Sequence, residues 1–174
     1  MLAMCLGRRG GRFAEIGAFD GVLHSNTCFL EADHGWCGVL VEPNPLLFSR
    51  LKASRTAHCL ERAVHRESGQ KLSFVASQEI GTLAEYAEAD GYAQHRRDAI
   101  SAGGLITVET ISFEDMATLD APAGTGFDYV SLDTEGSELD ILRGIDLVRH
   151  PVALFTIEHN FVEPRRGQMC TLLA

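Results

Sequence analysis

The feature that most constrains the fold is a repeated alternation of short apolar runs with longer segments that carry helix signals. The apolar runs occupy residues 13–16, 37–42, 56–60, 71–77, 105–111, 127–133 and 152–158. Strands that are apolar along most of their length are buried on both faces, which is typical of a parallel sheet. The alternation therefore predicts an α/β fold with a mainly parallel sheet and helices on both faces.

Capping residues indicate where helices begin between these runs. Ser25 can cap a helix that continues to about residue 34. Asn44 and Pro45 are well placed as the cap and the first turn of the next helix. Ser112 opens a third helix in a capping-box pattern, and a fourth helix is expected over residues 134–145.

Composition narrows the class of protein. At 174 residues the chain, residues 1–174, is expected to form a single domain. It lacks an apolar run long enough to span a bilayer, and its start fits a secretory signal poorly, so we expect a cytoplasmic protein. The formal net charge of −9 argues against nucleic acid or an anionic membrane as a partner. The five cysteines include no CxxC pair, and we interpret them as reduced core residues.

Residues 77–104 interrupt the alternation with a polar, alanine-rich segment that contains several glycines. We interpret it as a partly helical excursion or lid. Tyr86, Tyr92, His95 and Arg96 in this segment could contact a substrate, or they could belong to an amphipathic surface, and the sequence does not separate these alternatives.

Polar residues follow four of the predicted strands. Because ligands of such sheets bind at the carboxyl ends of the strands, we expect these residues to share one cleft. They are Glu15, Gly17, Asp20 and Gly21 after the first strand, Glu42 and Asn44 after the second, Asp133 and Glu135 after residues 127–133, and Glu158, His159 and Asn160 after residues 152–158.

The loop after the first strand is unsuited to a dinucleotide. A dinucleotide fingerprint has the form G-x-G-x-x-G, whereas this loop reads E-x-G-x-x-D-G, and Asp20 would repel a pyrophosphate. Glu42, at the end of the next strand, can accept hydrogen bonds from both hydroxyls of a ribose. An adenosine that lacks phosphate and carries an ammonium group describes S-adenosylmethionine, with Asp20 or Glu15 facing the ammonium side. The two glycines could instead form only a tight turn.

Several stretches resemble one known family. They are "FAEIGAFDGVLHSNTCFLE", "GWCGVLVEPNP", "ERAVH", "YVSLDTEGSELDILRGID" and "FTIEHN", and together they look like the FkbM-type S-adenosylmethionine-dependent methyltransferases. The resemblance implies a Rossmann-like class I methyltransferase fold and methylation of a hydroxyl group on a sugar or another small molecule.

The resemblance also implies roles for individual residues. Glu15, Gly17 and Gly21 would form the first cofactor motif, Glu42 would bind the ribose, and Ala63 and Val64 would lie beside the adenine. Asp133 and Glu135 would lie at the reaction cleft, and we include Asp20, Asn44 and Asp133 among the residues expected to bind the cofactor.

The chain also departs from the pattern of the family. It stops before the antiparallel hairpin that usually closes the sheet, so we expect the C-terminal β-hairpin to be lacking and the chain to be truncated. An uncovered strand edge could pair with a second copy of the chain to form a homodimer.

The reaction itself indicates which side chains to examine. A hydroxyl acceptor must lose its proton, and Asp133, Glu135 and His159 are the candidate bases. Each has a simpler interpretation, because the two acids could cap the following helix and the histidine could be structural.

Metal assistance is a second possibility. Asp133, Glu158 and Asn160 loosely resemble the Mg²⁺ ligands of catechol-type O-methyltransferases, although our primary expectation is that no metal is bound.

Two other functions compete with an active methyltransferase. One is an inactive cofactor-binding or regulatory module of the same fold. The other is a nicotinamide-dependent oxidoreductase, against which the missing G-x-G-x-x-G pattern argues.

Overall fold

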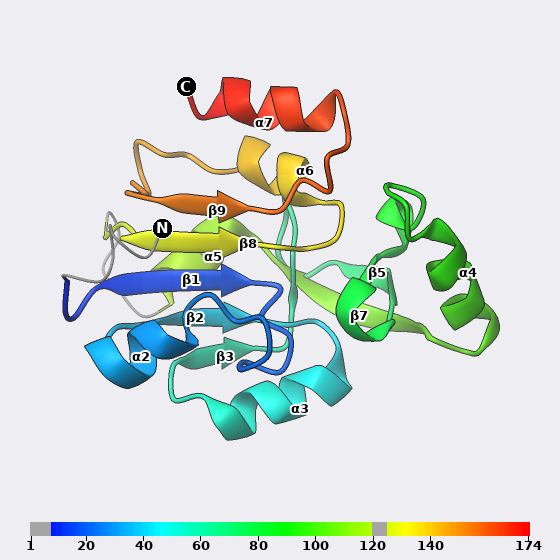
Figure 1. Ribbon diagram of the computed structural model, residues 1–174, viewed down its shortest axis with the longest axis horizontal. Coiled ribbons are helices and arrows are strands. Elements are labelled where there is room, and N and C mark those ends of the chain that lie inside the picture. Colours follow the sequence, from blue (N-terminus) through cyan, green and yellow to red (C-terminus); the bar gives the residue numbers. More distant parts are fainter. Residues whose placement is uncertain (1–7, 120–124) are drawn as a thin grey trace.

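A central parallel sheet of five strands dominates the computed structural model, which describes residues 8–119 and 125–174 (Figure 1). The strand order is β3-β2-β1-β8-β9, and all neighbouring strands are parallel. Their bounds are β1 (Arg12–Ile16), β2 (Cys37–Val41), β3 (His58–Leu60), β8 (Tyr129–Leu132) and β9 (Phe155–Ile157). The predicted α/β fold with a mainly parallel sheet is confirmed.

The order of the strands reverses beside β1. The chain builds outward from β1 through β2 to β3 and later returns to the other side of β1 as β8 and then β9. In open sheets of this kind, the crevice at the reversal point receives the ligand. The strand order thus predicts a ligand site at the carboxyl ends of β1, β2 and β8.

Alternate residues of the central strands enter two separate cores, one on each face of the sheet. Ala14 and Ile16 pack in the core that includes α5 (Phe113–Thr118), α6 (Glu138–Arg143) and Met169 of α7 (Arg165–Leu172). Phe13 packs in the other core, together with side chains of α2 (Cys28–His34) and α3 (Pro45–Ser54). Strands that are apolar on both faces are therefore covered by helices on both faces, as predicted.

A second sheet has four strands in the order β4-β7-β5-β6. Their bounds are β4 (Ala63–Val64), β5 (Lys71–Val75), β6 (Thr82–Leu83) and β7 (Leu105–Ile111). The central strands point toward the side of the molecule where β5, β7 and α4 (Ala93–Ser101) lie (Figure 1). Sequence reasoning did not separate this sheet from the first, because it identified the apolar runs but not that β5 pairs antiparallel with β7.

The excursion over residues 77–104 is partly helical, as predicted. It contains the 3₁₀ helices η1 (Gln78–Ile80) and η2 (Ala84–Tyr86), the short strand β6, and α4. Because β6 pairs with β5, the excursion is attached to the second sheet and is not a free loop.

Two of the three predicted helix caps, Asn44 and Ser112, are present, whereas the first helix begins at Cys28 with Thr27 in the N-cap position expected for Ser25. The side chain of Asn44 accepts a hydrogen bond from Leu46 N at 3.1 Å, and that of Ser112 accepts one from Asp115 N at 3.1 Å. The helix expected from residue 134 is shorter than predicted, because Glu135 has a φ of 59° and Gly136 a φ of 131°. These backbone conformations are incompatible with an α-helix.

The interpretation of the cysteines needs correction. Cys37 and Cys170 are exposed, so the interpretation of the cysteines as core residues is wrong for these two. Among the described residues, β9 is followed by α7 and by no further strand. The helices of the described ranges include none that is both long and apolar enough to cross a bilayer.

Candidate active site

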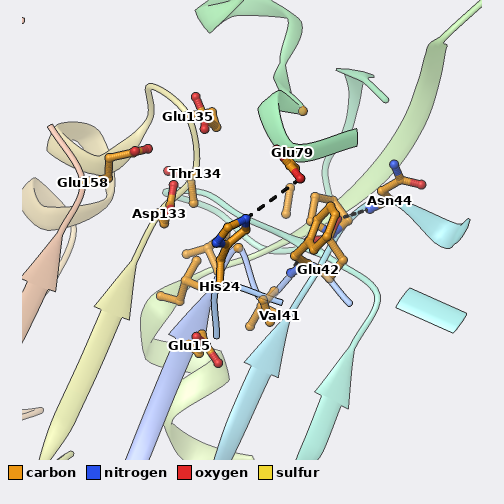
Figure 2. A pocket seen from close by; sticks show the side chains of 18 of the residues that line it. Glu15, His24, Val41, Glu42, Asn44, Glu79, Asp133, Thr134, Glu135 and Glu158 are labelled. Atoms are coloured by element: carbon orange, nitrogen blue, oxygen red, sulfur yellow. Dashed lines mark hydrogen bonds and ion pairs between the residues drawn. The ribbon is translucent and has the colours of Figure 1, made fainter. Parts of the chain in front are cut away.

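A cavity of about 370 Å³ lies at the carboxyl ends of β1, β2 and β8 and is bordered by the excursion (Figure 2). Its volume falls in the range of small-molecule sites. Of the residues that sequence analysis selected, the lining includes Glu15, Gly17, Glu42, Asn44, Ala63, Val64, Asp133, Glu135 and Glu158. It does not include Asp20, Gly21, His159 or Asn160.

Gly17 begins the loop after β1 and lies close to the ends of both neighbouring strands, β2 and β8. Its N–H donates to Val41 O at 2.9 Å, and the next amide, of Ala18, donates to the same oxygen at 3.0 Å. Gly17 has a φ of +82°, and an added Cβ would lie 1.7 Å from Asp133 O. Glycine is therefore required here both by the backbone conformation and by the close approach of the loop after β8.

Glu15 orients the loop that forms one wall of the cavity. Its Oε1 accepts a hydrogen bond from Asn26 N at 2.6 Å, and its Oε2 accepts from Ser25 Oγ at 2.8 Å and Thr27 Oγ1 at 2.6 Å. The guanidinium of Arg55 lies 3.6 Å from Oε2. The chain itself therefore supplies donors to both oxygens of this buried carboxylate.

Asp20 and Gly21 shape the same loop from outside the cavity lining. Asp20 Oδ1 accepts hydrogen bonds from Val22 N and Leu23 N. An added Cβ on Gly21 would approach Leu51 and Arg55 to within 2.7 Å, so a close packing contact requires glycine here.

Glu42 lies at the end of β2 and is 6% exposed. Its Oε2 accepts a hydrogen bond from Phe19 N at 3.0 Å, and its Oε1 accepts one from Asn44 N at 2.8 Å. Burial raises the pKa of Glu42 to about 7, while the two backbone amides oppose that rise. Each oxygen keeps a further lone pair that can accept a hydrogen bond from a ligand hydroxyl.

Other segments complete the wall beyond Glu42. Ala63 and Val64 of β4 are buried and line the cavity, so it has an apolar surface near the end of β2. His24 Nε2 lies 4.0 Å from Glu79 Oε1, which connects the first loop with the excursion across the cavity (Figure 2). His24 also belongs to the cavity lining.

Three carboxylates gather at the opposite side of the cavity. Oxygens of Asp133, Glu138 and Glu158 lie within 4.8 Å of one another. Burial and a hydrogen bond shared with Glu158 raise the pKa of Asp133 well above its usual range, although its side chain is exposed to the cleft. Glu158 Oε2 is buried, and no donor among the described residues bonds to it. Asp133 therefore keeps its proton to a higher pH than an ordinary aspartic acid does.

Glu138 differs from Asp133 and Glu158 because the loop that precedes it supplies hydrogen bonds to both of its carboxylate oxygens. It accepts hydrogen bonds from Thr134 N, Thr134 Oγ1 and Gly136 N. Sequence analysis included this glutamate in a motif without assigning it a role. A cation at this cluster would compete with those donors for Glu138, so Asp133 and Glu158 are the acids that remain available.

Glu135 has a left-handed backbone with a φ of 59°, which is unusual for a residue other than glycine. Its Oε2 accepts a hydrogen bond from Arg96 NH2 at 3.0 Å. Burial and the nearby Glu158 raise the pKa of Glu135 to about 7, and Arg96 opposes that rise. Strained backbone of this kind clusters at functional sites, which supports the selection of Glu135.

His159 and Asn160 are not brought into the cavity. His159 Nδ1 accepts a hydrogen bond from Phe161 N at 3.0 Å, and the two rings stack edge to face. Asn160 has a φ of 45° in the same turn. His159 therefore has a local structural partner, while Asp133 and Glu135 remain the candidate bases that line the cavity.

The four residues selected from the excursion have different surroundings. Tyr92 lines the cavity, whereas the hydroxyl of Tyr86 donates to Asp140 Oδ2 at 2.9 Å. His95 is exposed, but Arg96 is completely buried. Arg96 is thus neither a surface residue nor placed to touch a ligand, and both interpretations that we considered for it are wrong.

Polar residues that sequence reasoning missed also line the cavity. Asn26 Nδ2 donates to Ser131 Oγ at 3.0 Å, which links the first loop to β8. Ser131 points from an otherwise apolar strand, and a hydroxyl at such a position was the one signal that could have identified it.

Comparison with protein families gives one clear result. The model of the methyltransferase FkbM domain matches residues 15–173, which is most of the chain. Searches of curated proteins and of solved structures give no significant match. The chain therefore belongs to the FkbM methyltransferase family, as the sequence motifs had indicated.

Proposed function

We propose that this member of the FkbM family transfers a methyl group from S-adenosylmethionine to a hydroxyl group of a small molecule or a sugar. The observation that carries the proposal is the position of Glu42. It is a buried carboxylate at the carboxyl end of the strand next to β1, it faces the cavity, and two backbone amides orient it.

The residues of the cavity fit an adenosine. Glu42 can accept hydrogen bonds from both ribose hydroxyls, because each of its oxygens is engaged by one backbone amide only. Ala63 and Val64 supply an apolar surface suited to a purine ring. The first loop has an acid at position 20 and no dinucleotide fingerprint, which disfavours NAD.

The opposite side of the cavity fits the transfer step. S-adenosylmethionine supplies an electrophilic methyl group on a sulfonium. The protein must hold an acceptor oxygen in line with that group, and positioning of this kind lowers the barrier by several kcal/mol. Glu135 lines the cavity and has a pKa raised to about 7, so its carboxylate can take the acceptor proton near neutral pH. The pKa of Asp133 is raised further, so Asp133 becomes a base only at higher pH.

Calorimetric titration of S-adenosylhomocysteine tests the cofactor assignment. We expect micromolar binding to the wild type and at least about tenfold weaker binding to Glu42→Gln, a loss of about 1.4 kcal/mol. Glu61→Gln is the matched control, because Glu61 is an exposed acid just after β3.

The control ligand is NAD. Tight NAD binding would favour an oxidoreductase. If S-adenosylhomocysteine bound equally well to the Glu42 and Glu61 variants, the assignment of Glu42 to the ribose would be wrong. Strong binding followed by no methyl transfer to any of a panel of hydroxylated acceptors would favour an inactive cofactor-binding module.

A further inference from the structure

The guanidinium of Arg96 lies beside the cavity and has a hydrogen-bond acceptor for each of its N–H groups. Its side chain is 0% exposed. Its Nε donates to Ile80 O, and its NH1 donates to Ala87 O and Asp90 Oδ1. Its NH2 donates to Asp90 Oδ2 and to Glu135 Oε2. The five N–H groups of the guanidinium therefore have five acceptors.

These acceptors belong to two separate parts of the active site. Ile80, Ala87 and Asp90 lie in the excursion, whose residues 78–81 and Tyr92 line the cavity. Glu135 lies in the loop after β8, on the side with the candidate bases. A single buried side chain thus connects a wall of the cavity with a carboxylate at its reactive side.

The charged groups around Arg96 favour a guanidinium over an ammonium group at this position. The guanidinium lies between Asp90, whose side chain is 2% exposed, and Glu135, whose side chain is 12% exposed. Glu158 and Glu138 also face Glu135 and add negative charge. A planar guanidinium can bind one carboxylate through two N–H groups and a second carboxylate through a third, whereas a lysine ammonium cannot reproduce this geometry.

We propose that Arg96 is a positioning residue for methyl transfer, which holds residues 78–92 of the excursion and the Glu135 carboxyl in one fixed arrangement. This inference rests on the proposed function, since it assigns a role to Arg96 in the same site. Arg96 acts through Glu135 and the excursion, because it is buried behind them and does not line the cavity.

Two measurements on the unliganded protein test the proposal. The first is hydrogen–deuterium exchange of residues 78–92, and the second is the ¹³C signal of the Glu135 carboxyl at pH 8, assigned by its absence in Glu135→Gln. In Arg96→Lys and Arg96→Met we expect exchange at least about tenfold faster, together with a displaced Glu135 signal. The displacement should be smaller in Arg96→Lys, which keeps the positive charge.

Arg97 supplies the matched controls. It is the next residue of α4, it is half exposed, and it pairs with the exposed Glu88 at 2.7 Å. Because an exposed ion pair contributes little to stability, Arg97→Lys and Arg97→Met should change the exchange of residues 78–92 by less than about twofold and leave the Glu135 signal unchanged. If Arg96→Met does not fold, the same two measurements on Arg96→Lys and Arg97→Lys test the proposal.

Two outcomes would overturn the proposal. Faster exchange without any change in the Glu135 signal would mean that Arg96 braces the excursion only, and unchanged exchange would remove even that role. Neither measurement requires a cofactor. Binding of S-adenosylhomocysteine to the wild type tests the proposed function separately, so the two ideas can fail independently.

Discussion

The two sides of the cavity surround their carboxylates with different neighbours. Burial raises the pKa of both Glu42 and Asp133, but two backbone amides oppose the rise at Glu42, whereas neighbouring acids reinforce it at Asp133. Two backbone amides orient Glu42 before any ligand arrives, whereas the neighbouring acids favour the protonated form of Asp133. Under the proposed function, this difference predicts that Glu42 binds the ligand through oriented hydrogen bonds and that Asp133 responds to the charge of the ligand.

The largest expected effect comes from the residue where the two sides meet. In Gly17→Ala the new Cβ would collide with Asp133 O, and the residue would have a φ of +82°. We expect a loss of about 3 kcal/mol or more in the free energy of unfolding, measured by urea denaturation.

Gly69→Ala is the control for Gly17→Ala. Gly69 has a φ of +76°, but a Cβ there would meet nothing within 4 Å. We expect a cost of about 1 kcal/mol, from the backbone conformation alone. Equal losses in the two variants would contradict the claim that the close approach to Asp133 matters.

A smaller effect distinguishes a residue that senses the positive charge of the ligand from one that binds a part common to both ligands. If Asp133 faces the sulfonium, Asp133→Asn should weaken binding of S-adenosylmethionine about tenfold relative to S-adenosylhomocysteine, which is uncharged at sulfur. Glu42→Gln should weaken binding of both molecules by the same factor. Parallel calorimetric titrations measure the two ratios, and an unchanged ratio in Asp133→Asn would place the charge-sensitive group elsewhere.

The pH dependence of binding follows from the same comparison. The raised pKa of Asp133 means that this side chain loses its proton only as the pH rises. Ionised carboxylates attract a sulfonium, so the affinity for S-adenosylmethionine should increase from pH 6 to pH 9, with little change for S-adenosylhomocysteine. An affinity for S-adenosylmethionine that decreases with pH would be opposite in sign to this expectation.

The smallest effect concerns the stability of the unliganded protein. The acids beside Asp133 repel one another, and an asparagine amide could donate to Glu158 Oε2, so we expect Asp133→Asn to stabilise the fold by about 1 kcal/mol. For a chain of this length the melting temperature should rise by about 2–4 °C.

The sign of the pH effect on this gain can be derived from the pKa. The folded state binds the Asp133 proton more tightly than the unfolded state, so ionisation costs stability as the pH rises above the ordinary value of 3.8. The gain in Asp133→Asn should therefore be present at pH 8 and absent below pH 3.8. Asp98→Asn, at an exposed position, should show no such gain at any pH.

Adjacent arginines illustrate why part of the site could not be read from the sequence. Arg96 and Arg97 are identical in type and lie side by side in "HRRD", yet one is completely buried and the other is half exposed. Which face of α4 is buried depends on how the excursion packs beside β8. No local pattern in the sequence contains that information.

Local signals determined much of the molecule. The apolar runs, the caps at Asn44 and Ser112, and the family motifs predicted the α/β fold, the parallel sheet and the position of Glu42 at a strand end. These features depend on nearest neighbours along the chain, on backbone capping, and on the period of apolar residues. Such interactions are the same wherever the segment lies in space.

Only the tertiary structure decided which polar residues form the site. It brought Glu158 close to Asp133 but left His159, the next residue in the sequence after Glu158, in a local turn. It also separated β5 and β7 from the central sheet and joined Arg96 to Glu135 across 39 positions. Contacts between distant segments depend on the summed packing of the whole chain, because burial and electrostatic interactions act through space and not along the sequence.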